Sequence, residues 1–81
     1  MTDLRVIPGV AEKMKGHLQA IGINCVEDLI GQNAEDLFQK HNITRGSVDC
    51  RCVLYVYRCA VYYANTENPE FEKLQWNYWK D

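Results

Sequence analysis

The sequence lacks a hydrophobic run long enough to cross a membrane, since no apolar stretch approaches the roughly 18 residues that a membrane helix requires. Its first residues, Met1-Thr2-Asp3-Leu4, hold no basic region and no hydrophobic stretch, so we expect no signal peptide and a cytoplasmic protein. It also lacks a basic surplus: 9 Lys and Arg stand against 11 Asp and Glu, a net charge of −2. This balance weighs against strong nonspecific binding of nucleic acid, although it is compatible with a small basic patch.

The composition that is present indicates one small globular domain. Hydrophobic residues make up 47% of the 81 residues and charged residues 25%, which is typical of a folded chain rather than a disordered one. A chain of this length buries only about 60–65% of the surface that its unfolded form exposes, so its core needs nearly every large apolar residue. We therefore expect a single domain over residues 1–81.

The cysteines are not distributed as in a disulfide scaffold. Cys50, Cys52 and Cys59 fall in one apolar helical stretch, and with Cys25 or His41 they could be drawn as a zinc site. Within one helix, however, Cys50 and Cys52 point about 200° apart, and Cys52 and Cys59 stand roughly 10 Å apart. One helix cannot bring all three to one metal. We expect reduced cysteines that pack as small hydrophobes, with no metal and no cofactor.

Glycine, proline and asparagine divide the chain into segments with helical rather than alternating periodicity. The pattern predicts a helical turn over residues 3–6, then helices over 11–21, 24–30, 33–41, 48–64 and 69–74. In the first full helix, Met14, His17, Leu18 and Ile21 share one face. The helix over 48–64 is apolar almost all round, so it is expected at the centre of an all-α bundle.

Polar residues mark the expected helix ends. Asn24 with Glu27, and Asn33 with Asp36, have the spacing of an N-cap and its reciprocal partner. Asn42 is the expected terminator of the 33–41 helix. Ser47 is expected to cap the long helix, and Asn68, before Pro69, is expected to cap the last one.

The strongest motif is Ile7-Pro8-Gly9-Val10-Ala11, followed by Lys13 and Leu18. It resembles a helix-hairpin-helix, in which a glycine-rich turn presents backbone N–H groups at the start of the second helix, where they suit a phosphate. Ala11 stands where the second glycine of the pattern belongs, and Lys15 where a small residue is usual. The contact residues expected for DNA are Gly9, Val10, Ala11, Lys13 and Lys15.

Two further segments extend the resemblance to essentially the whole chain: residues 52–64 (CVLYVYRCAVYYA) and 76–81 (WNYWKD). They resemble the bacterial pathogenicity locus helix-hairpin-helix family, also labelled mitomycin-resistance-related. Residues 7–30 are more distantly similar to the C-terminal domain of TfoX-type competence regulators and to the SAM-like C-terminal domain of the RNA polymerase alpha subunit. The resemblance implies an all-α, SAM-like bundle of about five short helices with an N-terminal helix-hairpin-helix. It suggests nucleic-acid binding by analogy only.

The sequence offers no catalytic group. His17 lies on an apolar helix face and is expected to be a partly buried core residue, while His41 is expected in the last turn of its helix. No serine, histidine and carboxylate constellation is present, and a chain this small is not expected to enclose a substrate pocket. We expect neither an enzyme, nor a small-molecule substrate, nor a membrane partner.

Two kinds of binding remain open. The first is weak, sequence-independent DNA binding at the hairpin, where Arg5, Lys13 and Lys15 form a local positive excess that could equally be a solvated face. The second is protein interaction or homodimerisation through the Tyr-rich long helix or the aromatic C-terminal tail. For that tail, packing of Trp76 and Trp79 onto the core is favoured over an exposed partner site.

Overall fold

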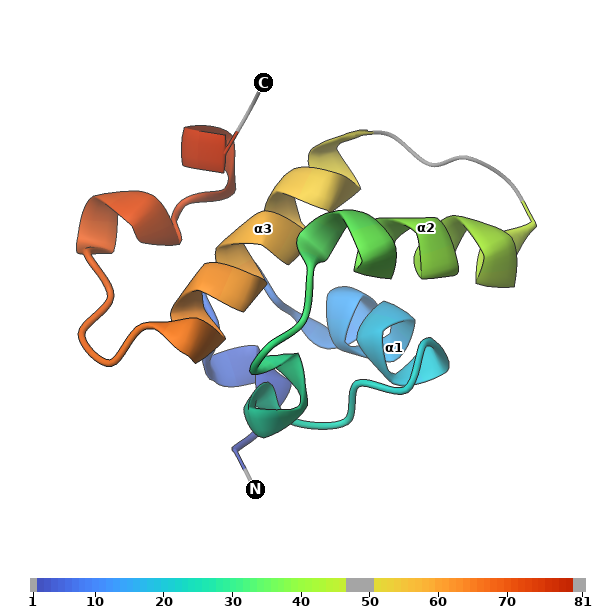
Figure 1. Cartoon of the computed structure of the whole chain (residues 1–81), viewed down its shortest axis with the longest axis horizontal. Coiled ribbons are helices and arrows are strands. Elements are labelled where there is room, and N and C mark those ends of the chain that lie inside the picture. The colour runs from blue at the N-terminus through green and yellow to red at the C-terminus, as the bar shows by residue number, and fades with distance from the viewer. Residues whose placement is uncertain (1, 47–50, 80–81) are drawn as a thin grey trace.

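The computed structural model describes residues 2–46 and 51–79, and within these ranges the chain forms helices and 3₁₀ turns with no strand (Figure 1). In chain order the elements are η1 (Leu4–Val6), α1 (Glu12–Ala20), η2 (Val26–Leu29), α2 (Ala34–Arg45), α3 (Arg51–Asn65), η3 (Phe71–Leu74) and η4 (Trp76–Trp79). The all-α prediction is confirmed. Of the expected helices, only three form as α-helices in the described ranges, and the shorter ones form as 3₁₀ turns.

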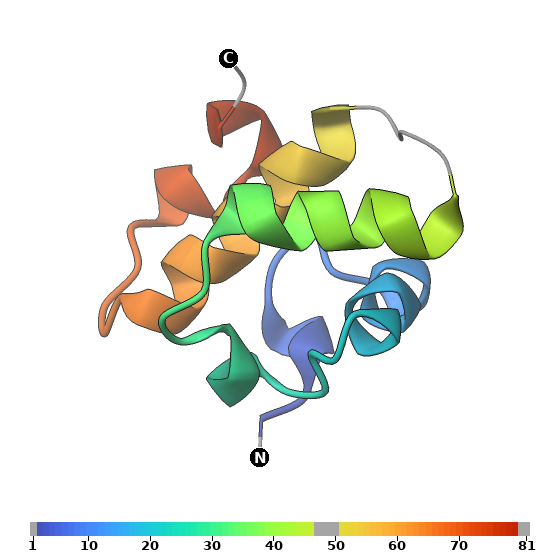
Figure 2. The same cartoon turned by 45° about the vertical axis from the view of Figure 1, so that its right-hand side comes forward.

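The helix α3 is the central element. It contacts α2, η2, η3 and η4, and it places Leu54, Tyr57, Cys59 and Ala60 in the interior. The α1 and α2 helices lie to one side of it and the turns η3 and η4 to the other, an arrangement visible in both views (Figures 1 and 2). The central position expected for the long helix is therefore confirmed. Its expected start at Val48 and the Ser47 cap lie outside the described residues.

A hydrophobic core joins the described elements from η1 to α3. Its members come from η1, the hairpin, α1, the segment between α1 and η2, η2 itself, α2 and α3: Leu4, Ile7, Val10, Leu18, Ile23, Val26, Leu29, Leu37, Phe38, Leu54, Tyr57 and Ala60. On α1 only Leu18 is fully buried, while the other members of the expected apolar face are partly buried. Of the helices described, none has the length and apolar character that crossing a bilayer requires.

The α2 helix confirms one expected boundary and corrects the other. The Asn33 side chain accepts hydrogen bonds from the Glu35 and Asp36 amides at 2.8 and 3.2 Å, as its spacing predicts. The expected end near His41, with Asn42 as terminator, is wrong, because the helix runs on to Arg45. Gly46 ends it with a φ of +76°. Glycine takes this left-handed conformation without the steric cost that asparagine bears, so the helix continues to the glycine.

The cap expected from Asn24 and Glu27 is wrong, because Glu27 has a distant partner. Cys25 occupies the N-cap position of η2 and makes no side-chain cap bond. The Glu27 carboxylate instead accepts hydrogen bonds from the Thr2 amide at 2.8 Å and the Thr2 hydroxyl at 2.6 Å. These two bonds lower the pKa of Glu27 to about 2. A tertiary contact across 25 residues thus replaces the local cap.

The expected start of the last helix at Asn68-Pro69 is wrong for a similar reason. Glu70 is the N-cap of η3, and its amide donates to the Tyr62 hydroxyl at 2.9 Å. Because this bond ties the chain to α3 just before η3, the turn begins at Phe71.

The cysteines follow the prediction only in part. Cys25 and Cys59 are buried and free, and burial raises the pKa of both thiols. Cys52, in contrast, is exposed, so its expected place in the core is wrong. It lies in the first turn of α3, next to the exposed Arg51, where the core no longer covers the helix. Cys50 lies outside the described residues.

Candidate nucleic-acid interface

The hairpin between η1 and α1 is a tight turn closed by its own backbone. The Val10 amide donates to the Ile7 carbonyl at 3.0 Å, with Pro8 and Gly9 at the two central positions. Gly9 has a φ of +90°, which side-chain-bearing residues rarely adopt. Proline followed by glycine in these positions is typical of a type II turn. The sequence therefore fixes the direction in which the chain enters α1.

The first turn of α1 presents unbonded amide groups. Ala11 occupies the N-cap position in an extended conformation and has no side-chain oxygen to offer, so no cap bond forms. The first bond of the helix runs from the Lys15 amide to the Ala11 carbonyl at 2.8 Å. Within the described ranges, the amides of Glu12, Lys13 and Met14 donate to no acceptor. Orphan donors at the positive end of a helix dipole attract an anion.

Most of the positive charge around the hairpin is neutralised within the protein. Arg5 forms ion pairs with Asp3 at 2.9 Å and with Glu12, and Lys15 pairs with Asp3 at 3.4 Å. Hydrogen bonds from the side chain and amide of Arg5 hold the pKa of Asp3 well below its usual range. Lys13, in contrast, is exposed and makes no ion pair with any described residue.

A hollow of about 380 Å³ lies beside the hairpin. Its lining comes from the turn, from α1, from the end of α2 and from the first turn of α3: Gly9, Ala11, Lys13, Met14, His17, Arg45 and Val53. We call it the hairpin hollow. It brings together three of the five expected contact residues, namely Gly9, Ala11 and Lys13. None of the described residues that line it carries a carboxylate.

The other two expected contact residues are placed differently. The Val10 side chain is buried in the core, with 5% of its surface exposed, and its amide closes the turn. Lys15 is partly buried and held by Asp3. Arg45, which sequence reasoning missed, takes their place at the hollow. Its position follows from the extra turn at the end of α2, so the only available signal was Gly46 as the better helix terminator.

An apolar surface continues from the hairpin hollow along α3. A neighbouring hollow of about 400 Å³ is lined by Gly9, Met14, Cys52, Val53 and Val56. It shares Gly9, Met14 and Val53 with the first. The two hollows together therefore combine a cationic edge with an apolar floor.

Behind His17, which lines the hairpin hollow, α2 contributes a buried polar residue, His41. It is 1% exposed, and its Nδ1 shares a hydrogen bond of 2.9 Å with the Tyr57 hydroxyl. The expectation of His41 in the last turn of its helix is wrong, since α2 continues past it by another turn. The His17 ring meets the His41 ring at 77°, with the centroids 4.8 Å apart. His17 is partly buried, as expected, and it is the member of this pair that lines the hairpin hollow.

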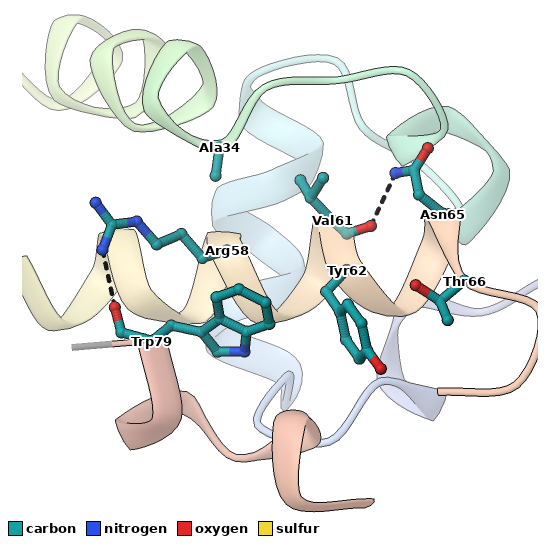
Figure 3. Close-up of a pocket in the computed structure, with 7 residues that line it drawn as sticks. All are labelled: Ala34, Arg58, Val61, Tyr62, Asn65, Thr66 and Trp79. Carbon is teal, nitrogen blue, oxygen red and sulfur yellow. Dashed lines mark hydrogen bonds between the residues drawn. The ribbon is translucent and has the colours of Figure 1, made fainter. Parts of the chain in front are cut away.

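A third hollow, of about 500 Å³, is lined by residues of α3 and just after it, of the start of α2 and of η4: Ala34, Arg58, Val61, Tyr62, Asn65, Thr66 and Trp79 (Figure 3). We call it the tail groove. Trp79 and Tyr62 form one wall with ring centroids 5.4 Å apart, and Ala34 faces them across the opening (Figure 3). The Trp79 indole N–H donates to the Lys73 carbonyl, and the Trp79 carbonyl accepts from Arg58, both at 2.8 Å.

These contacts confirm that Trp79 packs onto the folded domain. The side chain of Trp76 is not among those that the structure describes. The groove's one cation among the described lining residues, Arg58, is tied to the Glu35 carboxylate at 2.9 Å as well as to Trp79. The tail groove is therefore an apolar, aromatic surface rather than a cationic one.

Across residues 2–46 and 51–79, no three His, Cys, Asp or Glu side chains gather as metal ligands would. Comparisons with curated proteins and with solved structures returned no match. The comparison with protein families returned one that is described as Pathogenicity locus, matched over residues 1–81. Since this match covers the whole chain, as the hairpin motif and the aromatic end suggested, the protein belongs to the pathogenicity locus family.

Proposed function

We propose that this protein is a non-catalytic helix-hairpin-helix module of the SAM-like kind that binds the backbone of DNA weakly and without sequence preference. The observation that carries the proposal is the hairpin hollow. There Lys13 and Arg45, which belong to different helices, flank a helix start that has no side-chain cap. Cations and backbone amides that converge on one hollow are the groups that bind phosphate in proteins.

The charge distribution sets the strength of this binding. Arg5 and Lys15 are paired with Asp3 and Glu12, whereas Lys13 makes no ion pair with a described residue and lines the hollow. Arg45 of α2 also lines the hollow. The whole chain carries a net charge of −2, which repels a polyanion beyond the immediate contact. We expect one or two phosphate contacts, made to the backbone and therefore blind to base sequence.

A salt titration tests the proposal. Binding of a fluorescent DNA is measured by anisotropy at increasing salt, and the logarithm of affinity should fall with the logarithm of salt at a slope of about −1 to −2. Two unrelated sequences of equal length should give the same affinity. Absence of binding at low salt, or a strong sequence preference, would overturn the proposal.

A second candidate function is protein interaction or self-association through the tail groove. It is favoured by the aromatic wall of Trp79 and Tyr62 and by Tyr78, which is 51% exposed at the edge of the same tail. An apolar interface weakens little with salt, in contrast to phosphate binding. Sedimentation equilibrium at low and high salt would reveal a salt-independent dimer, and a monomer under both conditions would exclude self-association.

A further inference from the structure

A planar ring stands in the wall of the hairpin hollow. His17 lines the hollow from α1, and its ring is braced by the buried ring of His41 at 4.8 Å. His41 is itself fixed by its 2.9 Å hydrogen bond with Tyr57. An aromatic ring whose orientation is set in this way is the kind of platform on which unpaired nucleobases stack.

The surface beside His17 is apolar, which contact with phosphate alone does not require. Met14 and Val53 line both the hairpin hollow, of about 380 Å³, and the neighbouring hollow, of about 400 Å³. The apolar floor is therefore continuous between the two hollows. Lys13 and Arg45 line the first of these. A cationic edge beside a ring-bearing apolar floor matches a nucleotide, which joins an anionic phosphate to a flat, weakly polar base.

We infer that the hairpin hollow receives one unstacked nucleobase while Lys13 and Arg45 hold the adjoining phosphate, so that the protein prefers single-stranded nucleic acid to duplex. This inference rests on the proposed function and names the form of nucleic acid that the same site takes. A duplex must unpair and unstack a base before the hollow can receive it, whereas a single strand presents its bases already exposed. An acidic peptide would pair with Lys13 but would bring no flat base to the His17 ring.

Four probes of matched length separate these possibilities by anisotropy at low salt. They are a thymine homopolymer strand, the same strand paired with its complement, a strand of abasic sugar-phosphate units, and polyglutamate. We expect the thymine strand to bind about tenfold more tightly than the abasic strand, the effect of stacking one base. The duplex should bind at the abasic level, and polyglutamate more weakly than the thymine strand.

Each other outcome has a distinct meaning. Equal affinity for the thymine strand, the duplex and the abasic strand would overturn the base-binding inference and leave phosphate binding in place. Polyglutamate that binds as well as the thymine strand would overturn it in favour of an acidic partner. Failure of all the nucleic-acid probes to bind would overturn the proposed function together with the inference.

Variants of α1 locate the effect. His17→Ala should lower affinity for the thymine strand to the abasic level without changing affinity for the abasic strand, and His17→Phe should preserve the difference. Gln19→Ala, an exposed change on the same helix but outside the hollow, is the matched control. An unchanged preference in His17→Ala would overturn the role of the ring.

A measurement on the unaltered protein covers the case in which His17→Ala fails to fold. In proton NMR, the imidazole resonances of His17 should shift when the thymine strand is added and should not shift with the abasic strand. Identical spectra with both strands would overturn base stacking at this ring.

Discussion

The starts of α1 and α2 differ in whether a side chain caps their first-turn amides, and this difference distinguishes a helix start that only stabilises the fold from one that can bind a ligand. At α2, the Asn33 side chain accepts two amide hydrogen bonds, and Glu35 and Asp36 place negative charge in the first turn. At α1, Ala11 offers no acceptor, and the first turn contains Lys13 together with Glu12, whose carboxylate is paired with Arg5. At the start of α2, the Asn33 side chain occupies two of the first-turn amides, and the carboxylates of Glu35 and Asp36 would repel an anion. The α1 start keeps its donors available, at some cost in stability.

Reversing the charge at the open start should have the largest effect. Lys13→Glu places a carboxylate in the hairpin hollow beside the amides, so we expect DNA affinity at low salt to fall by more than about tenfold. Lys40→Glu, which makes the same charge change at an exposed position on α2, should lower affinity far less. Anisotropy with one DNA probe compares the two. Equal losses would show that net charge, rather than the hollow, governs binding.

Removing the Asn33 cap tests whether a capped helix start serves stability rather than binding. Asn33→Ala deletes the acceptor of two amide hydrogen bonds, so the free energy of unfolding should fall by about 1–2 kcal/mol. Urea denaturation measures this loss. DNA affinity of the folded variant should not change, because Glu35 and Asp36 still repel phosphate from this end. A variant that gains DNA binding would show that caps alone decide which helix start binds.

Sealing the start of α1 should stabilise the protein and weaken its binding at the same time. In Ala11→Ser the new hydroxyl can accept from the first-turn amides, raising the free energy of unfolding by about 1 kcal/mol. The same bond occupies donors that the phosphate would use, so DNA affinity should fall a few-fold. Ala11→Gly is the control, since it removes a methyl group and adds no acceptor, and it should tighten binding modestly. If the free energy of unfolding and the DNA affinity of Ala11→Ser both rose, or both fell, this interpretation would be contradicted.

The features that the sequence predicted are those set by neighbouring residues. Pro8 and Gly9 dictate the hairpin turn by their own conformational limits, and Asn33 caps α2 because its partners are two and three residues away. The family was recognised for the same reason, from contiguous motifs over the whole chain.

The features that it did not predict depend on distant contacts. Glu27 leaves its expected cap for Thr2, and the amide of Glu70 is tied to Tyr62. Arg45 enters the hairpin hollow because α2 continues to Gly46 and packs beside α1. The neutralisation of Arg5 and Lys15 by Asp3 also needs the fold, since sequence proximity alone shows three nearby cations and not which of them pair with carboxylates.

Acid should weaken the contact between Glu27 and Thr2, which we call the N-terminal tether, before it changes the difference in stability between the starts of α1 and α2. The Glu27 carboxylate binds Thr2, and its pKa in the folded protein is about 2 against an ordinary value of 4.5. A pKa lowered by folding stabilises the protein above the unfolded value, and this contribution is lost as the pH falls from 4.5 toward 2. Because Glu27 is exposed, the loss should be smaller than the effects of the Asn33 and Ala11 substitutions.

Urea midpoints measured across this range should decline in the wild type and decline less in Glu27→Gln, whose neutral amide has no such transition. The stabilisation gained by Ala11→Ser should persist at every pH, since neither alanine nor serine titrates. If Glu27→Gln declines as steeply as the wild type, the Thr2 contact does not set the acid response; if instead the gain of Ala11→Ser vanishes with acid, the α1 start is coupled to the tether and is not an independent end.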